Sequence, residues 1–190
     1  MSREDKRVIV LDFDDAIFPT TAHQKDPSFI NNPKFNDYIK SIKSFTNKLR
    51  ELKNTDIWIC TLGTPEWVSH ALNILKINFL ADLFKNRKIV YARKFDKETK
   101  SMRKMKCLGF QYIISQYKDR KVQILSIGDD LERDKIQFWK AVKNHPSILP
   151  KFILFKPSPK LEELIKELDI MTAQIEEVLD IEEGFDIDIF

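Results

Sequence analysis

Three carboxylates follow directly after the first apolar run of the chain. The segment VIVLDFDDAIFPT, residues 8–20, places Asp12, Asp14 and Asp15 at the end of this run. Two unit charges about 4 Å apart repel by roughly 4 kcal/mol at an effective dielectric near 20, so the cluster needs a cation or exposure to water. Carboxylates also serve as nucleophiles and as general acids or bases, and the segment is therefore a candidate active site.

Polar side chains also follow two later apolar runs. The run DIWIC leads into Thr61, and the segment ILSIGDDLERD carries Asp129, Asp130 and Asp134. If these runs are parallel strands, their carboxyl ends meet at one edge of the sheet, where ligands bind in open α/β proteins. Several oxygens gathered at one place suit Mg²⁺, which takes one or two carboxylates and keeps part of its water shell.

Short β-branched runs alternate with longer amphipathic stretches along the chain. We predict strands at residues 8–13, 56–61, 88–93, 122–127 and 151–155, and helices at residues 33–52, 65–75, 101–117, 131–143 and 160–179. This alternation favours a parallel sheet covered by helices on both faces. We therefore expect a three-layer α/β/α, Rossmann-like fold with a five-stranded sheet, in one domain over residues 1–190. The helix and acidic tail of residues 159–190 would pack on this core or extend from it.

The charge of the chain is nearly balanced but unevenly distributed. The net charge is only +3 over 190 residues, which excludes a polyelectrolyte character. Residues 85–106 nevertheless hold 10 Lys or Arg against 2 acids, and the last 15 residues hold 7 acids and no base. Both runs are typical of solvated surface, and the basic run would also attract an acidic partner or substrate.

The cysteines, histidines and apolar runs exclude several other classes of protein. Cys60 and Cys107 have no metal-ligand spacing, and neither opens a Cys-x5-Arg loop, which argues against a thiol phosphatase. The three histidines show no pairing in the sequence. No apolar run approaches 18 residues, and residues 1–7 lack a signal-peptide core, so we expect a cytoplasmic protein without a membrane partner. Export by a non-classical route stays open.

Taken together, these motifs resemble those of the haloacid dehalogenase superfamily of phosphotransferases. They are, in order, Asp12-Phe13-Asp14, Thr61, Lys106 in KMKCLGF, and Asp129, Asp130 and Asp134 in ILSIGDDLERD. The resemblance covers about residues 8–155, and DFDDAIFPT is similar to a little-characterised subgroup. Asp15 stands where the superfamily usually has Gly, and Ala16 where it often has Thr or Val. The Lys-x-x-x-Phe helix phase favours Lys106 over neighbouring basic residues as the motif lysine.

The resemblance implies hydrolysis of a phosphomonoester through an aspartyl-phosphate. Asp12 would attack phosphorus, and Asp14 would protonate the leaving oxygen and then deprotonate the attacking water. Thr61 and Lys106 would bind the phosphoryl oxygens. The Asp12 side chain, the Asp14 main-chain carbonyl and Asp129 would hold Mg²⁺, with Asp130 or Asp134 orienting its water ligands. Catalysis would consist mainly of positioning and electrostatic stabilisation.

The spacing between motifs leaves no room for a large cap domain. Residues 16–32 suffice for a flap or long loop, and the chain between Thr61 and Lys106 is occupied by two helices and a strand. An open site suits a phosphoprotein, and the capless relatives, which include magnesium-dependent protein tyrosine phosphatases, favour phosphotyrosine. The alternatives are a phosphatase of nucleic-acid ends, which no RNA-binding signature supports, a small-metabolite phosphatase, or a protein-binding module that has kept the pocket. The oligomeric state stays open.

Overall fold

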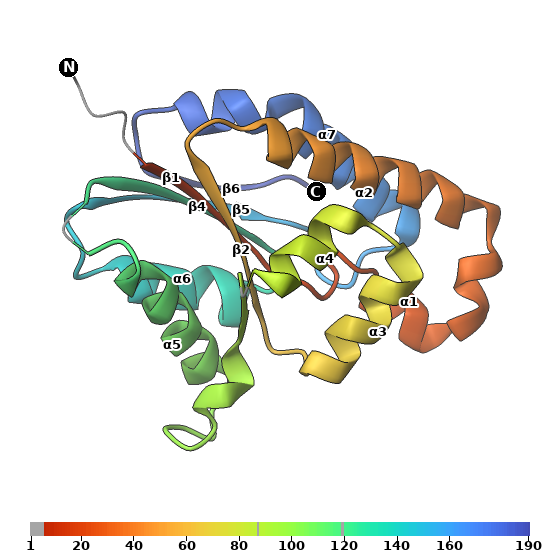
Figure 1. The fold of residues 1–190 in the computed structure, drawn as a ribbon, viewed down its shortest axis with the longest axis horizontal. Helices are drawn as coiled ribbons and strands as arrows, with labels where there is room; N and C mark the ends of the chain where they lie inside the picture. The colour runs from red at the N-terminus through yellow and green to blue at the C-terminus, as the bar shows by residue number, and fades with distance from the viewer. Residues whose placement is uncertain (1–5, 87, 119) are drawn as a thin grey trace.

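A six-stranded parallel sheet forms the centre of the protein. The computed structural model describes residues 6–86, 88–118 and 120–190. The strands are β1 (Lys6–Leu11), β2 (Thr55–Thr61), β3 (Ile89–Tyr91), β4 (Val122–Gly128), β5 (Ile148–Leu154) and β6 (Phe185–Asp188). Their spatial order is β3-β2-β1-β4-β5-β6, and every pair is parallel (Figure 1). The predicted α/β fold is confirmed, whereas the predicted number of five strands is wrong by one.

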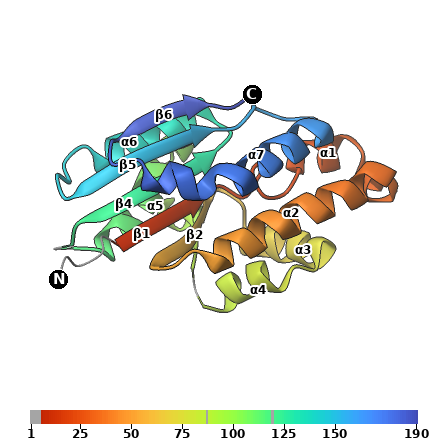
Figure 2. The ribbon, with the colours of Figure 1, turned by 90° about the horizontal axis from the view of Figure 1, so that it is seen from above.

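Helices cover both faces of this sheet. They are α1 (Thr20–Lys25), α2 (Pro33–Glu51), α3 (Pro65–Leu75), α4 (Asn78–Lys85), α5 (Met102–Ser115), α6 (Ile136–Val142) and α7 (Leu161–Asp180). Helices α2 and α7 lie side by side over one face, with α3 and α4 beyond α2, while α5 and α6 cover the opposite face (Figure 2). Short 3₁₀ turns η1 (Pro27–Asn31) and η2 (Ala92–Phe95) and a π-helical turn η3 (Leu131–Lys135) complete the elements.

Alternating side chains of each central strand build two separate cores. In β1, Ile9 and Leu11 join the cluster under α2 and α7, while Val8 and Val10 join the cluster under α5 and α6. All four are at most 2% exposed. A strand buried on both faces reads as a continuous apolar run, which is why the sequence located it.

The C-terminal segment closes one edge of the sheet. The acidic stretch that the sequence left undecided forms β6, which pairs in parallel with β5. Lys135 of η3 holds it through ion pairs of 2.9 Å to Asp186 and 3.3 Å to Asp188. Helix α7 is fixed in turn by the buried Lys151, whose ammonium donates to the carbonyl oxygens of Val178 and Leu179 at 2.9 and 3.0 Å. The acidic tail is therefore part of the sheet.

Within the described residues, no segment forms a separate cap domain. Residues 16–32 form α1 and η1, and the chain between β2 and α5 forms α3, α4, β3 and η2. The predicted helix at residues 131–143 is divided, because Asp130 accepts backbone bonds from both Asp134 and Lys135 and so opens one wide turn before α6. In the same part of the chain, no helix combines the length and apolarity needed to cross a membrane.

Candidate active site

Four charged side chains from three parts of the chain meet at the carboxyl ends of β1 and β4. Asp12 follows β1, Asp129 and Asp134 follow β4, and Lys106 comes from the first turns of α5. The Lys106 ammonium lies 2.6 Å from an Asp12 carboxylate oxygen and 2.7 Å from Asp134. Asp12, Asp129 and Asp134 each offer one oxygen within 4.8 Å of the others. Lys106 is itself 1% exposed, so this is a buried ionic cluster.

Burial and crowding shift the ionisation of these groups in opposite directions. Burial and the Asp134 carboxylate raise the pKa of Asp12 well above its usual range, although Lys106 opposes them. The same two causes raise the pKa of Asp129 to about 8. Burial lowers the pKa of Lys106, but Asp12 and Asp134 outweigh it and leave that pKa above its ordinary value. One lysine thus offsets only part of the repulsion among three carboxylates.

A glycine at the end of β4 makes room for Asp134. A Cβ at Gly128 would lie 2.6 Å from the Asp134 Oδ2 and 2.8 Å from its Cβ, closer than real atoms approach. The wide turn of η3 brings Asp134 back under Asp129, where its Oδ2 accepts the Asp130 amide at 3.2 Å. The absence of a side chain at Gly128 therefore leaves the space that Asp134 occupies. The sequence interpretation did not assign this role to Gly128.

Asp14 faces a set of neutral donors. Its Oδ1 accepts hydrogen bonds from the Thr20 hydroxyl and the Trp67 indole, both at 2.7 Å. Its Oδ2 lies 3.4 Å from the Thr61 hydroxyl, which in turn accepts the Gly63 amide at 2.8 Å. One carboxylate oxygen is thus held by two short bonds, while the other has a single long contact. Thr20 and Trp67 were not among the predicted site residues.

Trp67 is positioned by the start of α3 and by an aromatic cluster. Thr64 is the N-cap of α3, and its hydroxyl accepts the Trp67 amide at 3.3 Å. The Trp67 ring stacks on the ring of His23 in α1, with 5.7 Å between the ring centroids, and its centroid lies 6.0 Å from that of His70. The ring centroids of His23 and His70 are also 6.0 Å apart, a packing contact between α1 and α3. This aromatic cluster holds α1 against α3 beside Asp14.

Asp15 shapes the turn between β1 and α1. Its φ of 56° is left-handed, a conformation that Gly, Asn and Asp adopt most readily, so an aspartate here is compatible with a position usually held by Gly. Its carboxylate accepts hydrogen bonds from the Thr21 amide and hydroxyl. Burial raises the pKa of Asp15. The neighbouring Ala16 is 3% exposed, and its side chain is buried in the core.

Asp130 faces away from the ionic cluster. Its Oδ1 accepts the Glu132 amide at 2.9 Å and the Arg133 amide at 2.7 Å, which makes it the N-cap of η3. Its Oδ2 binds the Arg133 guanidinium through two contacts of 2.5 Å. Burial opposes them, but these bonds lower the pKa of Asp130. Of the two acids expected to orient water, Asp134 therefore lies in the cluster and Asp130 at its outer rim.

The residues present fit a hard divalent cation. The cluster of Asp12, Asp129 and Asp134 is oxygen-only, and the raised pKa values of Asp12 and Asp129 reflect burial together with repulsion that a cation would relieve. The Asp14 carboxylate was not expected to bind metal directly, and it is directed to Thr20 and Trp67 instead. The side chains that could hold Mg²⁺ thus include Asp134, which the sequence interpretation had placed among the water-orienting groups.

Magnesium should stabilise the protein more strongly as the pH rises. Protons and Mg²⁺ compete for the carboxylates, and Asp129, with a pKa of about 8, is mostly protonated at pH 6 and mostly ionised at pH 9. We expect the Mg²⁺-induced rise in melting temperature to grow between these pH values, as measured by thermal denaturation with and without the ion. The Asp129→Asn variant should lose most of this increase. A shift independent of pH would contradict the assignment.

A small pocket opens onto the cluster. It measures about 80 Å³ and is lined by Asp12, Asp14, Asp15, Leu62, Lys106, Asp129, Asp130, Arg133 and Asp134. Thr61 is fully buried behind Asp14. Thr61 and the ionic cluster therefore lie below the surface, deeper than the open site expected from the sequence would place them. Cys60 lies nearby, but burial raises its pKa to about 12, so its thiol is not a nucleophile.

Comparisons with known proteins leave the site to be interpreted on its own geometry. No family model matches the chain, and no curated protein matches it.

Proposed function

We propose that this protein is a magnesium-dependent phosphomonoester hydrolase that works through an aspartyl-phosphate. The observation that carries this proposal is the contrast between Asp12 and Asp14. Two residues apart, they have different surroundings, Asp12 within the ionic cluster beside Lys106 and Asp14 among neutral hydroxyl and indole donors. Groups of one type in different environments are typical of an active site that divides nucleophilic and acid–base roles.

The geometry supports a division of labour among the residues of the chain. Asp12 attacks phosphorus, and Lys106 beside it stabilises negative charge on the phosphoryl oxygens. Thr20 and Trp67 fix Asp14 through its Oδ1, so that its Oδ2 can give a proton to the leaving oxygen and later take one from the attacking water. The Thr61 hydroxyl, next to that Oδ2, would bind a phosphoryl oxygen.

Mg²⁺ would be held by Asp12 and Asp129, with Asp134 beside them. When bound, it supplies Lewis-acid stabilisation of charge on the transferring group. Lys106 and Mg²⁺ together would reduce the repulsion between the carboxylates and an incoming phosphate.

The size of the pocket favours a large phosphorylated substrate. At about 80 Å³ it has room for a phosphoryl group and its ligands, and the remainder of the substrate would stay outside. No cap domain encloses the pocket within the described residues. We therefore propose a phosphoprotein as the substrate, with phosphotyrosine as the first class to test. A protein-binding module remains the second candidate, since Asp130, Arg133 and their neighbours present charges at the rim.

The test is turnover of p-nitrophenyl phosphate, lost with EDTA and restored by Mg²⁺. The Asp14→Asn variant should lose about 10²- to 10⁴-fold in kcat on phenyl phosphate, because the phenolate needs a proton from Asp14 to leave. Its loss on p-nitrophenyl phosphate should be clearly smaller, since nitrophenolate leaves without a proton.

Asp169→Asn, an equivalent change of an exposed acid on α7, is the matched control and should leave both rates unchanged. Equal losses of Asp14→Asn on the two substrates would argue against the acid role. Absence of Mg²⁺-dependent turnover in the wild-type protein would refute the enzyme and leave the binding module.

A further inference from the structure

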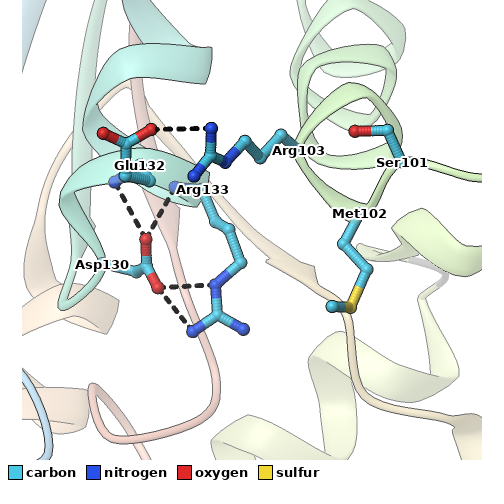
Figure 3. Close-up of a pocket in the computed structure, with 6 residues that line it drawn as sticks. All are labelled: Ser101, Met102, Arg103, Asp130, Glu132 and Arg133. Carbon is cyan, nitrogen blue, oxygen red and sulfur yellow. Dashed lines mark hydrogen bonds and ion pairs between the residues drawn. The ribbon is translucent and has the colours of Figure 1, made fainter.

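A groove with two arginines adjoins the catalytic pocket. It measures about 590 Å³ and lies between the start of α5 and η3. Its lining residues are Ser101, Met102 and Arg103 on one wall and Asp130, Glu132 and Arg133 on the other (Figure 3). Asp130 and Arg133 also line the catalytic pocket, so the two spaces share a wall. A substrate whose phosphate enters the pocket would place its neighbouring atoms in this groove.

The guanidinium groups of the groove are paired with carboxylates and remain partly exposed. Arg103 reaches across from α5 to Glu132 at 3.2 Å, and both side chains are about half exposed (Figure 3). Arg133 pairs with Asp130 at 2.5 Å, with 45% of the arginine side chain exposed. Exposed ion pairs contribute little to stability, so the Arg103 guanidinium can exchange Glu132 for a carboxylate of a ligand at small cost. The planar guanidinium also suits bidentate binding of a carboxylate.

Part of the basic run of residues 85–106 extends this charged surface. Arg93, at the carboxyl end of β3, donates to the carbonyl oxygen of Leu62, which lines the catalytic pocket, at 2.5 Å. Lys88 lies at the amino end of β3, 4.0 Å from Asp56 and over the Trp58 ring at 4.3 Å. The run therefore reaches the site at Arg93, Arg103 and Lys106, whereas Lys88 belongs to the opposite edge of the sheet.

We propose that this groove binds the residues that flank the phosphorylated residue of a protein substrate, and that Arg103 and Arg133 select an acidic residue there. The assignment rests on the phosphatase activity proposed above. Glu132 and Asp130 lie beside the two arginines, so the lining has no net positive charge to attract a continuous polyanion, while it leaves partners for a peptide with isolated acids and free backbone amides. The exposed Met102 offers an adaptable apolar contact on the same wall.

Binding of phosphopeptides to the full-length Asp14→Asn protein, measured by fluorescence anisotropy with Mg²⁺, tests the groove separately from turnover. Two phosphotyrosine peptides are compared, one with acidic residues on both sides of the phosphotyrosine and one with alanines in their place. We expect the acidic peptide to bind about fivefold more tightly, the upper end of what exposed ion pairs provide. The preference should weaken at high salt because the contacts are partly exposed.

The second arm adds Arg103→Gln to the same protein, which should bring the two affinities to within about twofold of each other. The matched control is Arg50→Gln, an exposed arginine at the distant end of α2, which should keep the full preference. Equal affinities for both peptides, or a preference that survives Arg103→Gln, would overturn the proposal. Tighter binding of a 5′-phosphorylated oligonucleotide than of the acidic peptide would also overturn it. If the wild-type protein showed no turnover but the acidic peptide still bound more tightly, the result would support the proposed role of the groove and refute only the phosphatase activity.

Discussion

The Asp12→Asn variant is expected to lose phosphatase turnover by about four orders of magnitude or more, because an amide cannot form the aspartyl-phosphate. The fold should survive this change. Burial and Asp134 raise the pKa of Asp12, which means that the ionised carboxylate is less favourable in the folded site than in water. A neutral isostere should therefore leave the free energy of unfolding at pH 7 unchanged or slightly increased.

Steady-state kinetics with p-nitrophenyl phosphate and urea denaturation would measure the two effects on the same preparation. The Mg²⁺-induced rise in melting temperature should shrink in this variant, since one oxygen ligand is lost from the cluster. A folded Asp12→Asn protein that turns over at the wild-type rate would exclude Asp12 as the nucleophile. A variant that is inactive only because it is unfolded would argue against the raised pKa.

The sequence predicted the site well where local pattern decides position. Asp12, Thr61 and Asp129 follow β-branched runs that are buried on both faces, and parallel strands necessarily bring their carboxyl ends together. Helix phase likewise distinguishes Lys106, which is buried and reaches Asp12, from the exposed Lys104 two residues earlier. The positions of these residues follow from the periodicity of apolar residues along a strand or helix, which can be seen in the sequence.

Contacts between distant segments were beyond such reasoning. The indole of Trp67 donates to Asp14, a contact that depends on the docking of α1 on α3. Asp130 and Asp134 are equivalent in the sequence, and the wide turn of η3 separates their roles. Strand β6 was undecided because alternating acids are unusual in a strand, and the cation that compensates them, Lys135, lies 51 residues before Asp186.

Removal of the Lys106 ammonium should have the largest effect on stability. In Lys106→Met, Asp12 and Asp134 lose a fully buried partner at 2.6 and 2.7 Å, and breaking such a pair costs about 3–5 kcal/mol. The cost should depend on pH. Without Lys106 the folded pKa values of Asp12 and Asp129 rise further above their unfolded values, so the variant loses stability as the pH increases between the unfolded and folded values and regains it when these carboxyls are protonated. We expect a smaller difference from the wild type at pH 5 than at pH 8 in urea denaturation.

Lys151→Met provides a matched control for this pH dependence. Lys151 is also a fully buried lysine, but its ammonium donates to the carbonyl oxygens of Val178 and Leu179, which do not titrate. Burial lowers the pKa of Lys151 itself to about 8, so this lysine changes charge only near the upper end of the interval, and Lys151→Met should show a much smaller rescue at low pH than Lys106→Met. Mg²⁺ should also stabilise Lys106→Met more than the wild type, because the ion would then be the principal cation among the carboxylates, and should have no extra effect on Lys151→Met. Equal stability of Lys106→Met and the wild type at pH 8 would show that Lys106 does not offset the charge of the cluster.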